Sequence, residues 1–246
     1  MIVIPMAGLS ARFTAAGYDK PKYMLPLAGK SLFDHAILSF EDYFATEPFL
    51  FVFRDVAGTP AFVAERIAQL DVRTATLVSL DAPTAGQAET VAIGLRRAKV
   101  DPASDITIFN IDTFRPGFAM PAIASDPDSD GYLEVFEGEG ANWSFVRPDP
   151  ASPKWAAETA EKRPISNLCC TGLYQFRRAS AFLEAFEAAK SDPTLLGPKS
   201  EVYVAPLYNW LIRNGGKIGY DIVPRESVIF CGVPAEYDAL LADPPV

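Results

Sequence analysis

The sequence predicts an α/β fold in which a mixed, mostly parallel sheet carries helices on both faces. Strand-like and helix-like segments alternate along the first half of the chain, as expected of β-α-β units that build a parallel sheet. Residues 49–53 form a continuous apolar run, which is typical of a strand covered on both faces. At 246 residues, of which 49% are hydrophobic, the chain is long enough to bury a full core.

The individual elements of the first half follow from local patterns. An apolar strand at 1–7 opens the chain, and Ser31 with Asp34 marks the start of a helix whose apolar residues share one face. The segments that follow are expected to be a strand at 49–53, a helix at 60–70, a strand at 73–80, a helix at 87–98 and a strand at 105–109. Ligands of such sheets bind beyond the carboxyl ends of the strands. The turns after the first and last of these strands are therefore candidate binding segments.

Shorter elements are expected in the second half. Several short strands within 131–146 and 154–176 are separated by a proline-rich loop at 147–153. The remainder is expected to hold helices at about 178–189 and 200–213, strands near 217–223 and 228–231, and a short helix from about residue 235. Because no internal repeat, low-complexity tract or interdomain linker interrupts the sequence, residues 1–246 are predicted to form a single domain.

Charge and composition narrow the classes of partner and site. The net charge of −9 disfavours nucleic acid or an anionic membrane surface as a partner, because either needs an excess of Lys and Arg. The opening strand is too short, and lacks the basic flank, for a signal peptide or a membrane span, so we expect a cytoplasmic protein. Three cysteines, including the adjacent Cys169 and Cys170, are expected to be reduced and buried. His35, the single histidine, excludes multi-histidine metal sites and is expected to be an ordinary helix residue.

Residues 1–30 are the most informative part of the chain. The opening strand runs into a turn of small residues, AGLSAR at 7–12, whose backbone N–H groups can point outward and hold a phosphate. Arg12, Lys20 and Lys22 lie within reach of that turn. In an acidic chain, three cations around a small-residue loop indicate a local phosphate clamp rather than general basicity.

Two common phosphate-binding patterns do not fit this loop, and a third does. The dinucleotide fingerprint G-x-G-x-x-G is absent because LSA follows Gly8, and a Walker A loop ending at 29–31 fails because Met24 stands where that motif requires glycine. AGLSAR at 7–12, followed by KPKYMLPLAGK at 20–30, resembles the two-part signature of the sugar-1-phosphate nucleotidyltransferases. That signature is a small- and glycine-rich loop ending in Arg, then Pro-Lys and an apolar stretch ending in Gly-Lys.

Further segments resemble the same family in the right order, so the resemblance spans nearly the whole chain. They are TAGQAETV at 84–91, NID at 110–112, EK at 161–162 with ISN at 165–167 and TGLY at 171–174, and GVPAEY at 232–237. The resemblance implies a Rossmann-like, nucleotide-diphospho-sugar transferase fold, similar to that of GT-A glycosyltransferases. In this fold, residues 1–115 would form the nucleotide-binding half and residues 116–246 the acceptor-binding half.

The resemblance also implies an activity. Such enzymes transfer a nucleoside monophosphate from a nucleoside triphosphate to a phosphorylated acceptor, here expected to be a sugar 1-phosphate, and release pyrophosphate. The product would serve nucleotide-sugar or surface polysaccharide biosynthesis. Two anionic reactants must meet, so charge neutralisation and alignment carry most of the catalysis. The attacking phosphate is already an anion, so the reaction needs no general base. The base, the acceptor and the oligomeric state, including a homo-oligomer, stay open.

The functional residues of the family carry over to matching positions. Arg12 and Lys22 are the expected catalytic residues, and Asp112 is expected to bind Mg²⁺, which takes oxygen ligands and needs only one or two protein carboxylates. The nucleotide is expected to contact Ala7, Gly8, Leu9, Ser10, Ala11 and Gln87, the last placed to read the base. The acceptor is expected to contact Lys162, Gly172 and Glu201.

The aromatic-rich segment at 199–212 divides between core and acceptor pocket. Its apolar side chains are expected to be buried, namely Leu207, Trp210 and Leu211. The polar residues at its start or on its other face are expected to contact the acceptor, namely Glu201, Tyr203 and Asn209.

One position departs from the family pattern. Many relatives carry a second metal-binding aspartate two residues before the late Gly-Thr-Pro, and Phe230 stands there in this chain. Either Asp221 or Glu201 substitutes, or Asp112, water and phosphates hold the metal alone. The loop is also sparser in glycine than usual, which indicates a divergent branch.

Three alternatives remain open from the sequence. A cytidylyltransferase of a non-sugar phosphate would share these motifs. A GT-A glycosyltransferase could use NID at 110–112 as a degenerate Asp-x-Asp, but the pair of Arg12 and Lys22 is needed by a triphosphate and not by a diphospho-sugar. A nucleotide-binding regulatory subunit without catalysis is the third alternative, and Phe230 is the only direct hint of it.

Overall fold

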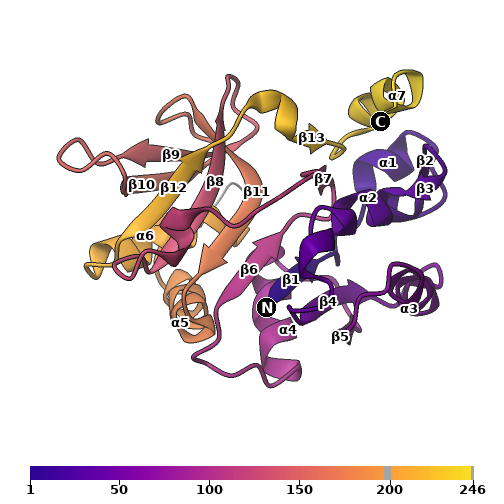
Figure 1. Cartoon of the computed structure of the whole chain (residues 1–246), viewed down its shortest axis with the longest axis horizontal. Helices are drawn as coiled ribbons and strands as arrows, with labels where there is room; N and C mark the ends of the chain where they lie inside the picture. The colour runs from indigo at the N-terminus through magenta and orange to yellow at the C-terminus, as the bar shows by residue number, and fades with distance from the viewer. Residues whose placement is uncertain (197–200, 245–246) are drawn as a thin grey trace.

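The computed structural model describes residues 1–196 and 201–244, and a mixed nine-stranded sheet runs through both halves of the chain (Figure 1). The first half contributes β1 (Ile2–Pro5), β4 (Phe49–Arg54), β5 (Ala75–Leu80) and β6 (Ile106–Phe109). These strands are parallel, with β1 between β4 and β6, and β5 at the edge beyond β4. The predicted β-α-β arrangement of the first half is confirmed, although the first strand leaves the sheet after Pro5.

The strands of the second half join the sheet mostly antiparallel. They are β8 (Gly131–Glu137), β9 (Ser144–Pro148), β10 (Ala156–Glu161), β11 (Leu168–Phe176) and β12 (Ile218–Ile222). Strand β11 pairs antiparallel with β6, β8 and β9, and so connects the two halves. Strand β10 lies antiparallel beside β9, whereas β12 pairs parallel with β8. That the two halves form a single domain stays a prediction.

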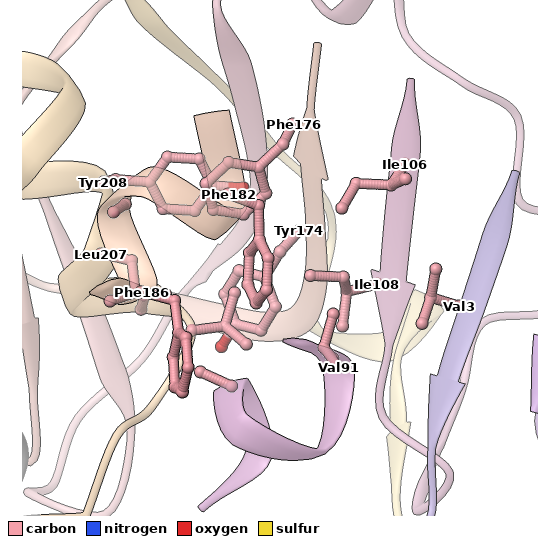
Figure 2. Close-up of a cluster of buried hydrophobic side chains, with 14 of the residues drawn as sticks. Val3, Val91, Ile106, Ile108, Tyr174, Phe176, Phe182, Phe186, Leu207 and Tyr208 are labelled. Atoms are coloured by element: carbon pink, nitrogen blue, oxygen red, sulfur yellow. The ribbon is translucent and has the colours of Figure 1, made fainter. Parts of the chain in front are cut away.

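Helices cover both faces of the sheet, as predicted. One face packs against α4 (Gln87–Arg97), α5 (Ala179–Ala189) and α6 (Tyr208–Arg213), and the other against α2 (Leu32–Leu38) and α3 (Thr59–Gln69). On the first face, Phe176 of β11 packs 5.1 Å from Phe182 of α5 and stacks 4.3 Å from Tyr208 of α6, measured between ring centroids (Figure 2). Burial of such large rings supplies much of the driving force for folding.

Short helices, paired strands and turns complete the fold. They are α1 (Ala11–Ala15), α7 (Pro234–Ala242), the paired strands β2 (Pro26–Leu27) and β3 (Lys30–Ser31), the paired strands β7 (Thr113–Phe114) and β13 (Ile229–Phe230), and single 3₁₀ turns. The 3₁₀ turns are at Lys22–Met24, Glu41–Tyr43, Ala122–Ser125, Pro193–Leu195, Ala205–Leu207 and Arg225–Ser227. Pairing of β7 with β13 brings the late segment at 231–237 beside the end of β6. Over the described ranges, no helix is long and apolar enough to cross a membrane.

Local predictions are confirmed at several points. The start of α2 is a complete capping box, in which the Ser31 backbone N–H donates to the Asp34 carboxylate and the Asp34 N–H donates to Ser31 Oγ. His35 lies in this helix and its Nε2 bonds the carbonyl of Leu27 at 2.9 Å. All three cysteines are buried and free of disulfides.

The predicted helix at 200–213 is wrong in its first half. Ser200 lies outside the described residues, and α6 begins only at Tyr208, after a 3₁₀ turn. Residues 201–204 are not helical because Val202 bonds the start of α4. The Ala88 N–H donates to Val202 O at 3.0 Å, and the Val202 N–H donates to Ala85 O at 3.3 Å. Tertiary contacts therefore override the helical pattern in this segment.

Candidate active site

Two adjoining cavities open at the carboxyl ends of β1 and β6. The first has a volume of about 560 Å³ and is lined by the loop at 5–13, the start of α4 and the segment after β6. The second, of about 580 Å³, is lined by that same segment together with residues of β9, β10 and β11. The two share Arg12, Gln87, Asn110, Asp112 and Gly232. They therefore form one cleft with a junction at Arg12 and Asp112.

The residues that the family resemblance assigns to catalysis, nucleotide, Mg²⁺ and acceptor all line this cleft, apart from Asn209 and Asp221. The first cavity is lined by Ala7, Gly8, Leu9, Ser10, Ala11, Arg12, Lys22, Gln87, Asp112 and Glu201, and the second by Lys162 and Gly172 in addition to Arg12, Gln87 and Asp112. Glu201 was predicted to contact the acceptor, and the structure places it beside the loop in the first cavity. The roles of these residues stay predictions.

The small-residue loop is tied to the lysine segment that follows it. Ser10 takes a left-handed backbone conformation (φ 52°), and its hydroxyl accepts a hydrogen bond from the backbone N–H of Lys22 at 3.2 Å. Its carbonyl accepts from the N–H groups of Phe13 and Thr14 at the start of α1. Leu9 is 59% exposed at the mouth of the loop. The serine thus fixes the position of Lys22 relative to the loop.

Lys22 and Asp112 meet at the junction of the two cavities. Lys22 Nζ lies 2.5 Å from Asp112 Oδ2, and the two side chains are only 19% and 25% exposed. Burial alone would raise the pKa of the Asp112 carboxyl, but the Lys22 ammonium and its hydrogen bond bring that pKa below its ordinary value. The carboxylate is therefore ionised at neutral pH, as a cation ligand must be.

Asn110 connects the nucleotide side of the cleft to the acceptor side. Its Oδ1 accepts a hydrogen bond from Gln87 Nε2 at 2.5 Å, and its backbone N–H donates to Gly172 O at 3.1 Å. Gly172 has φ 101°, and a Cβ there would lie 2.4 Å from Asn110 Nδ2. Only glycine fits this position without displacing Asn110.

Lys162, Tyr203 and Glu201 form a chain of polar contacts along the acceptor side. Lys162 Nζ donates to Tyr203 Oη at 2.9 Å and lies 4.8 Å above the tyrosine ring centroid. The Tyr203 hydroxyl in turn donates to the Glu201 carboxylate. Burial and this carboxylate raise the pKa of Tyr203, so its hydroxyl stays protonated. The neighbouring Glu161 is nearly buried, accepts from Ser144 Oγ, and has its pKa raised by that burial.

The predicted acceptor contact of Asn209 is wrong. Asn209 is 8% exposed, and both polar atoms of its side chain bond β10: Oδ1 accepts from the Thr159 N–H and Nδ2 donates to Thr159 O, both at 2.8 Å. Leu207 and Leu211 are buried in the core as predicted, and Trp210 packs partly buried against it. Asn209 therefore fastens α6 to the sheet.

Phe230 cannot ligate a metal and belongs to an aromatic wall. Its ring centroid lies 4.7 Å from that of Trp143 and 5.4 Å from that of Phe136, with the Arg225 guanidinium 4.7 Å from the ring centroid. Of the two suggested substitutes, Glu201 lines the cleft, whereas Asp221 is exposed on β12 and lines neither cavity.

The donor set of the cleft fits Mg²⁺ that arrives with phosphates. Within residues 1–196 and 201–244, no group of three or more His, Cys, Asp or Glu side chains is arranged to hold a metal ion. Mg²⁺ does not need such a cage, since it keeps several water molecules and takes phosphate oxygens plus one or two carboxylates. The ionised Asp112 carboxylate at the junction supplies one such ligand.

Sequence reasoning gave no role to two features beside Asp112. Glu236 caps the start of α7 by accepting from the N–H groups of Gly232 and Val233 at 2.7 and 3.2 Å. A Cβ on Gly232 would lie 3.2 Å from Asp112 Oδ2, so glycine keeps that side of the carboxylate open. Pro234 and Glu236 have the spacing of a helix start, and this local signal could have predicted the cap.

Trp143, which packs against Phe230 in the aromatic wall, was also not predicted. It lies in the loop before β9 and carries no such local signal.

Comparison with protein-family models gives no match, and comparison with curated protein sequences gives none either. Among solved structures, the chain is 50% identical to the nucleoside-diphosphate-sugar pyrophosphorylase from Vibrio cholerae RC9, with a TM-score of 0.93, over 99% of this chain and 100% of that chain. It is 13% identical to the inositol-1-phosphate CTP transferase from T. maritima (TM-score 0.73, 96% and 90% covered). It is 15% identical to the UTP-bound UGPase from Acinetobacter baumannii (TM-score 0.69, 98% and 91% covered). The two distant similarities show the fold alone, and the predicted nucleotide-diphospho-sugar transferase fold is confirmed.

Proposed function

This chain belongs to the sugar-1-phosphate nucleotidyltransferase family, and from that premise we propose that it transfers a nucleoside monophosphate from a nucleoside triphosphate to a phosphorylated acceptor. A sugar 1-phosphate is the proposed acceptor. An oxygen of the acceptor phosphate attacks the α-phosphorus, the bond from that phosphorus to the bridging oxygen of the β-phosphate breaks, and pyrophosphate leaves. We further propose that the reaction takes place in the cytoplasm and supplies nucleotide-sugars for polysaccharide biosynthesis.

The residues of the first cavity would bind the triphosphate. Residues 8–11 and the exposed Arg12 line this cavity, where the loop amides and the guanidinium would bind the β- and γ-phosphates. Lys22, fixed by Ser10, would contact the α-phosphate and stabilise the negative charge that builds there during attack. Gln87 Nε2 donates one hydrogen bond to Asn110, and the remaining polar groups of this amide, namely Oε1 and the second N–H, would contact the base. These cations offset the repulsion between the two anionic reactants.

Asp112 would hold Mg²⁺ at the junction of the two cavities, beside the position proposed for the α-phosphate. When bound, the ion supplies charge neutralisation between the phosphates. Gly232 leaves room for it beside the carboxylate. Asp112 is aligned through its backbone, since its carbonyl accepts from the Cys231 N–H at 2.8 Å.

The second cavity would bind the acceptor. Lys162 is a cation on this side of the cleft, 39% exposed, and would hold the acceptor phosphate. The proposed substrate carries hydroxyl groups, which could donate hydrogen bonds to the nearly buried Glu161 carboxylate. The hydroxyls of Ser144 and Tyr203 could also form hydrogen bonds with this substrate. Gly172 lines this cavity and leaves space for Asn110 beside the backbone of β11.

One observation carries this proposal: Lys22 and Asp112 meet where a phosphate-loop cavity opens into a cavity that has its own lysine. The test is pyrophosphate release by the purified protein with each nucleoside triphosphate and a panel of sugar 1-phosphates, with Mg²⁺. We expect turnover with one triphosphate and its loss by roughly 10²-fold or more in Lys22→Ala. Lys20→Ala is the matched control: Lys20 was predicted to belong to the phosphate clamp, but the structure leaves it exposed and outside both cavities.

Two results would count against the proposal. Binding of a nucleoside diphospho-sugar, with neither pyrophosphate release nor the reverse pyrophosphorolysis, would favour a glycosyltransferase. Triphosphate binding without turnover for any acceptor, unchanged by Lys22→Ala, would favour a regulatory subunit. A raised melting temperature with the triphosphate reports binding independently of turnover.

A further inference from the structure

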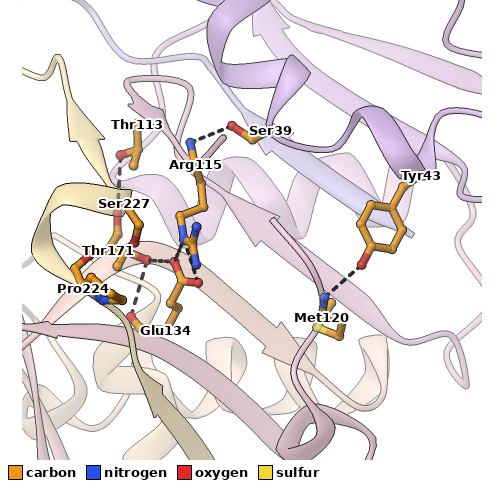
Figure 3. A network of polar contacts seen from close by, with 9 residues as sticks. All are labelled: Ser39, Tyr43, Thr113, Arg115, Met120, Glu134, Thr171, Pro224 and Ser227. Atoms are coloured by element: carbon orange, nitrogen blue, oxygen red, sulfur yellow. Dashed lines mark hydrogen bonds and ion pairs between the residues drawn. The ribbon is translucent and has the colours of Figure 1, made fainter. Parts of the chain in front are cut away.

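Four residues behind Asp112 are linked into a closed circuit by hydrogen bonds and by the short stretch of chain between two of them, and we call this circuit the buried ring: Thr113, Arg115, Glu134 and Thr171 (Figure 3). Thr113 Oγ1 donates to the backbone carbonyl of Thr171 at 3.4 Å, and Thr171 Oγ1 donates to Glu134 Oε1 at 3.0 Å. Arg115 Nε donates to both carboxylate oxygens of Glu134 at 3.1 Å. Thr113 and Arg115 are two residues apart in the chain, which closes the circuit.

The ring is built on an irregularity in the sheet. Between the pairs Cys170–Val135 and Tyr174–Leu133, β11 advances by more residues than β8, so the stretch at 171–173 bulges away from its neighbour. Glu134 is the β8 residue opposite the bulge, and its carboxylate bonds the hydroxyl of Thr171.

The bulge turns two backbone carbonyls toward the segment that contains Asp112. Gly172 O accepts from the Asn110 N–H at 3.1 Å, and Thr171 O accepts from Thr113 Oγ1. Asp112 lies between these two anchored residues. Its own carboxylate therefore projects into the cleft from a backbone that is fastened on both sides to β11.

Burial makes these contacts difficult to replace. Thr113, Glu134 and Thr171 are each 1% exposed, and the Arg115 side chain is 14% exposed. Water has little access to take over a broken bond, so loss of one contact leaves a buried polar group unpaired. Arg115 is also fixed through its backbone N–H, which donates to Ser39 Oγ at 2.8 Å, outside the ring (Figure 3).

We propose that the buried ring is a positioning device, with Thr171 as its central residue, that holds Asp112 and Gly172 at a fixed separation. None of the four side chains needs to touch a reacting atom for this role. The inference rests on the proposed function, because it assigns to the ring the alignment of the metal-binding carboxylate with the acceptor-side backbone. Alignment errors of about 1 Å at such junctions lower turnover by orders of magnitude.

The test compares variants that remove or keep one hydroxyl. Thr171→Val removes the donor to Glu134 while Arg115 still pairs that carboxylate, so the variant is expected to fold. Thr171→Ser keeps the hydroxyl. Thr159→Val is the matched control, because Thr159 is also 1% exposed and donates a hydroxyl to a backbone carbonyl, that of Ala205 at 2.6 Å, but lines neither cavity.

Three quantities are measured: the melting temperature, the steady-state constants with a Mg²⁺ titration, and Mn²⁺ binding by electron paramagnetic resonance with triphosphate but no acceptor. In Thr171→Val we expect the Mg²⁺ half-saturation and the acceptor KM to rise roughly tenfold and Mn²⁺ binding to weaken by a similar factor. Thr171→Ser should stay within about twofold of the wild type. Thr159→Val should lower only the melting temperature.

The outcomes separate the two proposals. If the wild type turns over, and if Thr171→Val and Thr159→Val have the same kinetic constants and the same Mn²⁺ binding, the positioning role is overturned. The proposed function would then still stand. Absence of wild-type turnover would overturn the proposed function. The Mn²⁺ comparison would then decide the positioning role by itself, since equal Mn²⁺ affinity in wild type and Thr171→Val contradicts it.

Discussion

Lys22 and Asp112 neutralise each other in the cleft, with Nζ 2.5 Å from Oδ2. In the proposed reaction the two groups serve different ligands, the lysine an α-phosphate and the aspartate a metal ion. The ion pair must therefore give way when the metal and the nucleotide bind. Phe230 supplies no second carboxylate, and Asp112, the proposed metal ligand, is already paired with Lys22 in the free protein.

The first prediction concerns competition between Lys22 and the metal. Lys22→Met keeps the length of the side chain but frees the Asp112 carboxylate, so Mn²⁺ should bind the nucleotide-free variant more tightly than the wild type. Turnover should fall by roughly 10²-fold or more, because the α-phosphate loses its cation. Electron paramagnetic resonance of free Mn²⁺ measures the affinity. Lys20→Met should change neither property, and equal Mn²⁺ affinity in Lys22→Met and wild type would contradict the competition.

The second prediction is a pH dependence of stability. The pKa of Asp112 is lower in the folded protein than in the unfolded chain, where it is about 3.9. The ion pair therefore stabilises the fold fully above that unfolded value, and this contribution is lost as pH falls through the lower folded pKa.

Asp112→Asn should accordingly lower the free energy of unfolding by about 2 kcal/mol at pH 7, and by progressively less as the pH falls below about 4. Urea unfolding of wild type and variant across this range measures the difference. Asp221→Asn, at an exposed aspartate of β12, should show no comparable change. A difference between wild type and Asp112→Asn that stays constant down to pH 3 would rule out the ion pair as its source.

The third prediction concerns Gly172. An alanine there would have its Cβ 2.4 Å from Asn110 Nδ2 and would be held at φ 101°, so Asn110 must move and its bond to Gln87 must break. Gly172→Ala should cost about 1–3 kcal/mol of stability and raise the KM of both substrates, because Gln87 lines both cavities and the bulge lines the second. Gly215→Ala also has a positive φ but open space around it, and should lower stability without changing either KM.

The sequence was sufficient for the parts of the site that local chemistry specifies. The loop at 7–12 and Asp112 follow the ends of the buried strands β1 and β6, and apolar runs place those ends at one edge of the sheet. Lys22 lies in the segment that follows the loop. Their meeting in one cleft follows from the parallel order of β1 and β6. For the same reason the start of α2 was predictable, since Ser31 and Asp34 are neighbours in sequence.

The rest depends on pairings that no local pattern reports. Thr113 and Thr171 are 58 positions apart, and their bond exists only because β11 bulges opposite Glu134. The helix predicted from residue 200 was wrong because Val202 bonds α4 instead of its own chain neighbours. The helical pattern places Asn209 on the face opposite the apolar side chains and so predicts a contact with the acceptor, whereas in the structure both polar atoms of its side chain bond β10.

The last prediction separates the two cavities through Tyr203. Its hydroxyl accepts from Lys162 and donates to Glu201, so Tyr203→Phe leaves the ring under Lys162 but releases both polar partners. With a lost hydrogen bond costing about 1 kcal/mol, the acceptor KM should rise about fivefold while the triphosphate KM stays unchanged. Glu201→Ala should also raise the acceptor KM, by a smaller factor, and leave the triphosphate KM unchanged.

Tyr220→Phe is the control for this prediction, because the Tyr220 hydroxyl bonds Pro153 O away from the cleft. A raised triphosphate KM with an unchanged acceptor KM would instead assign Glu201 and Tyr203 to the nucleotide, in whose cavity Glu201 lies.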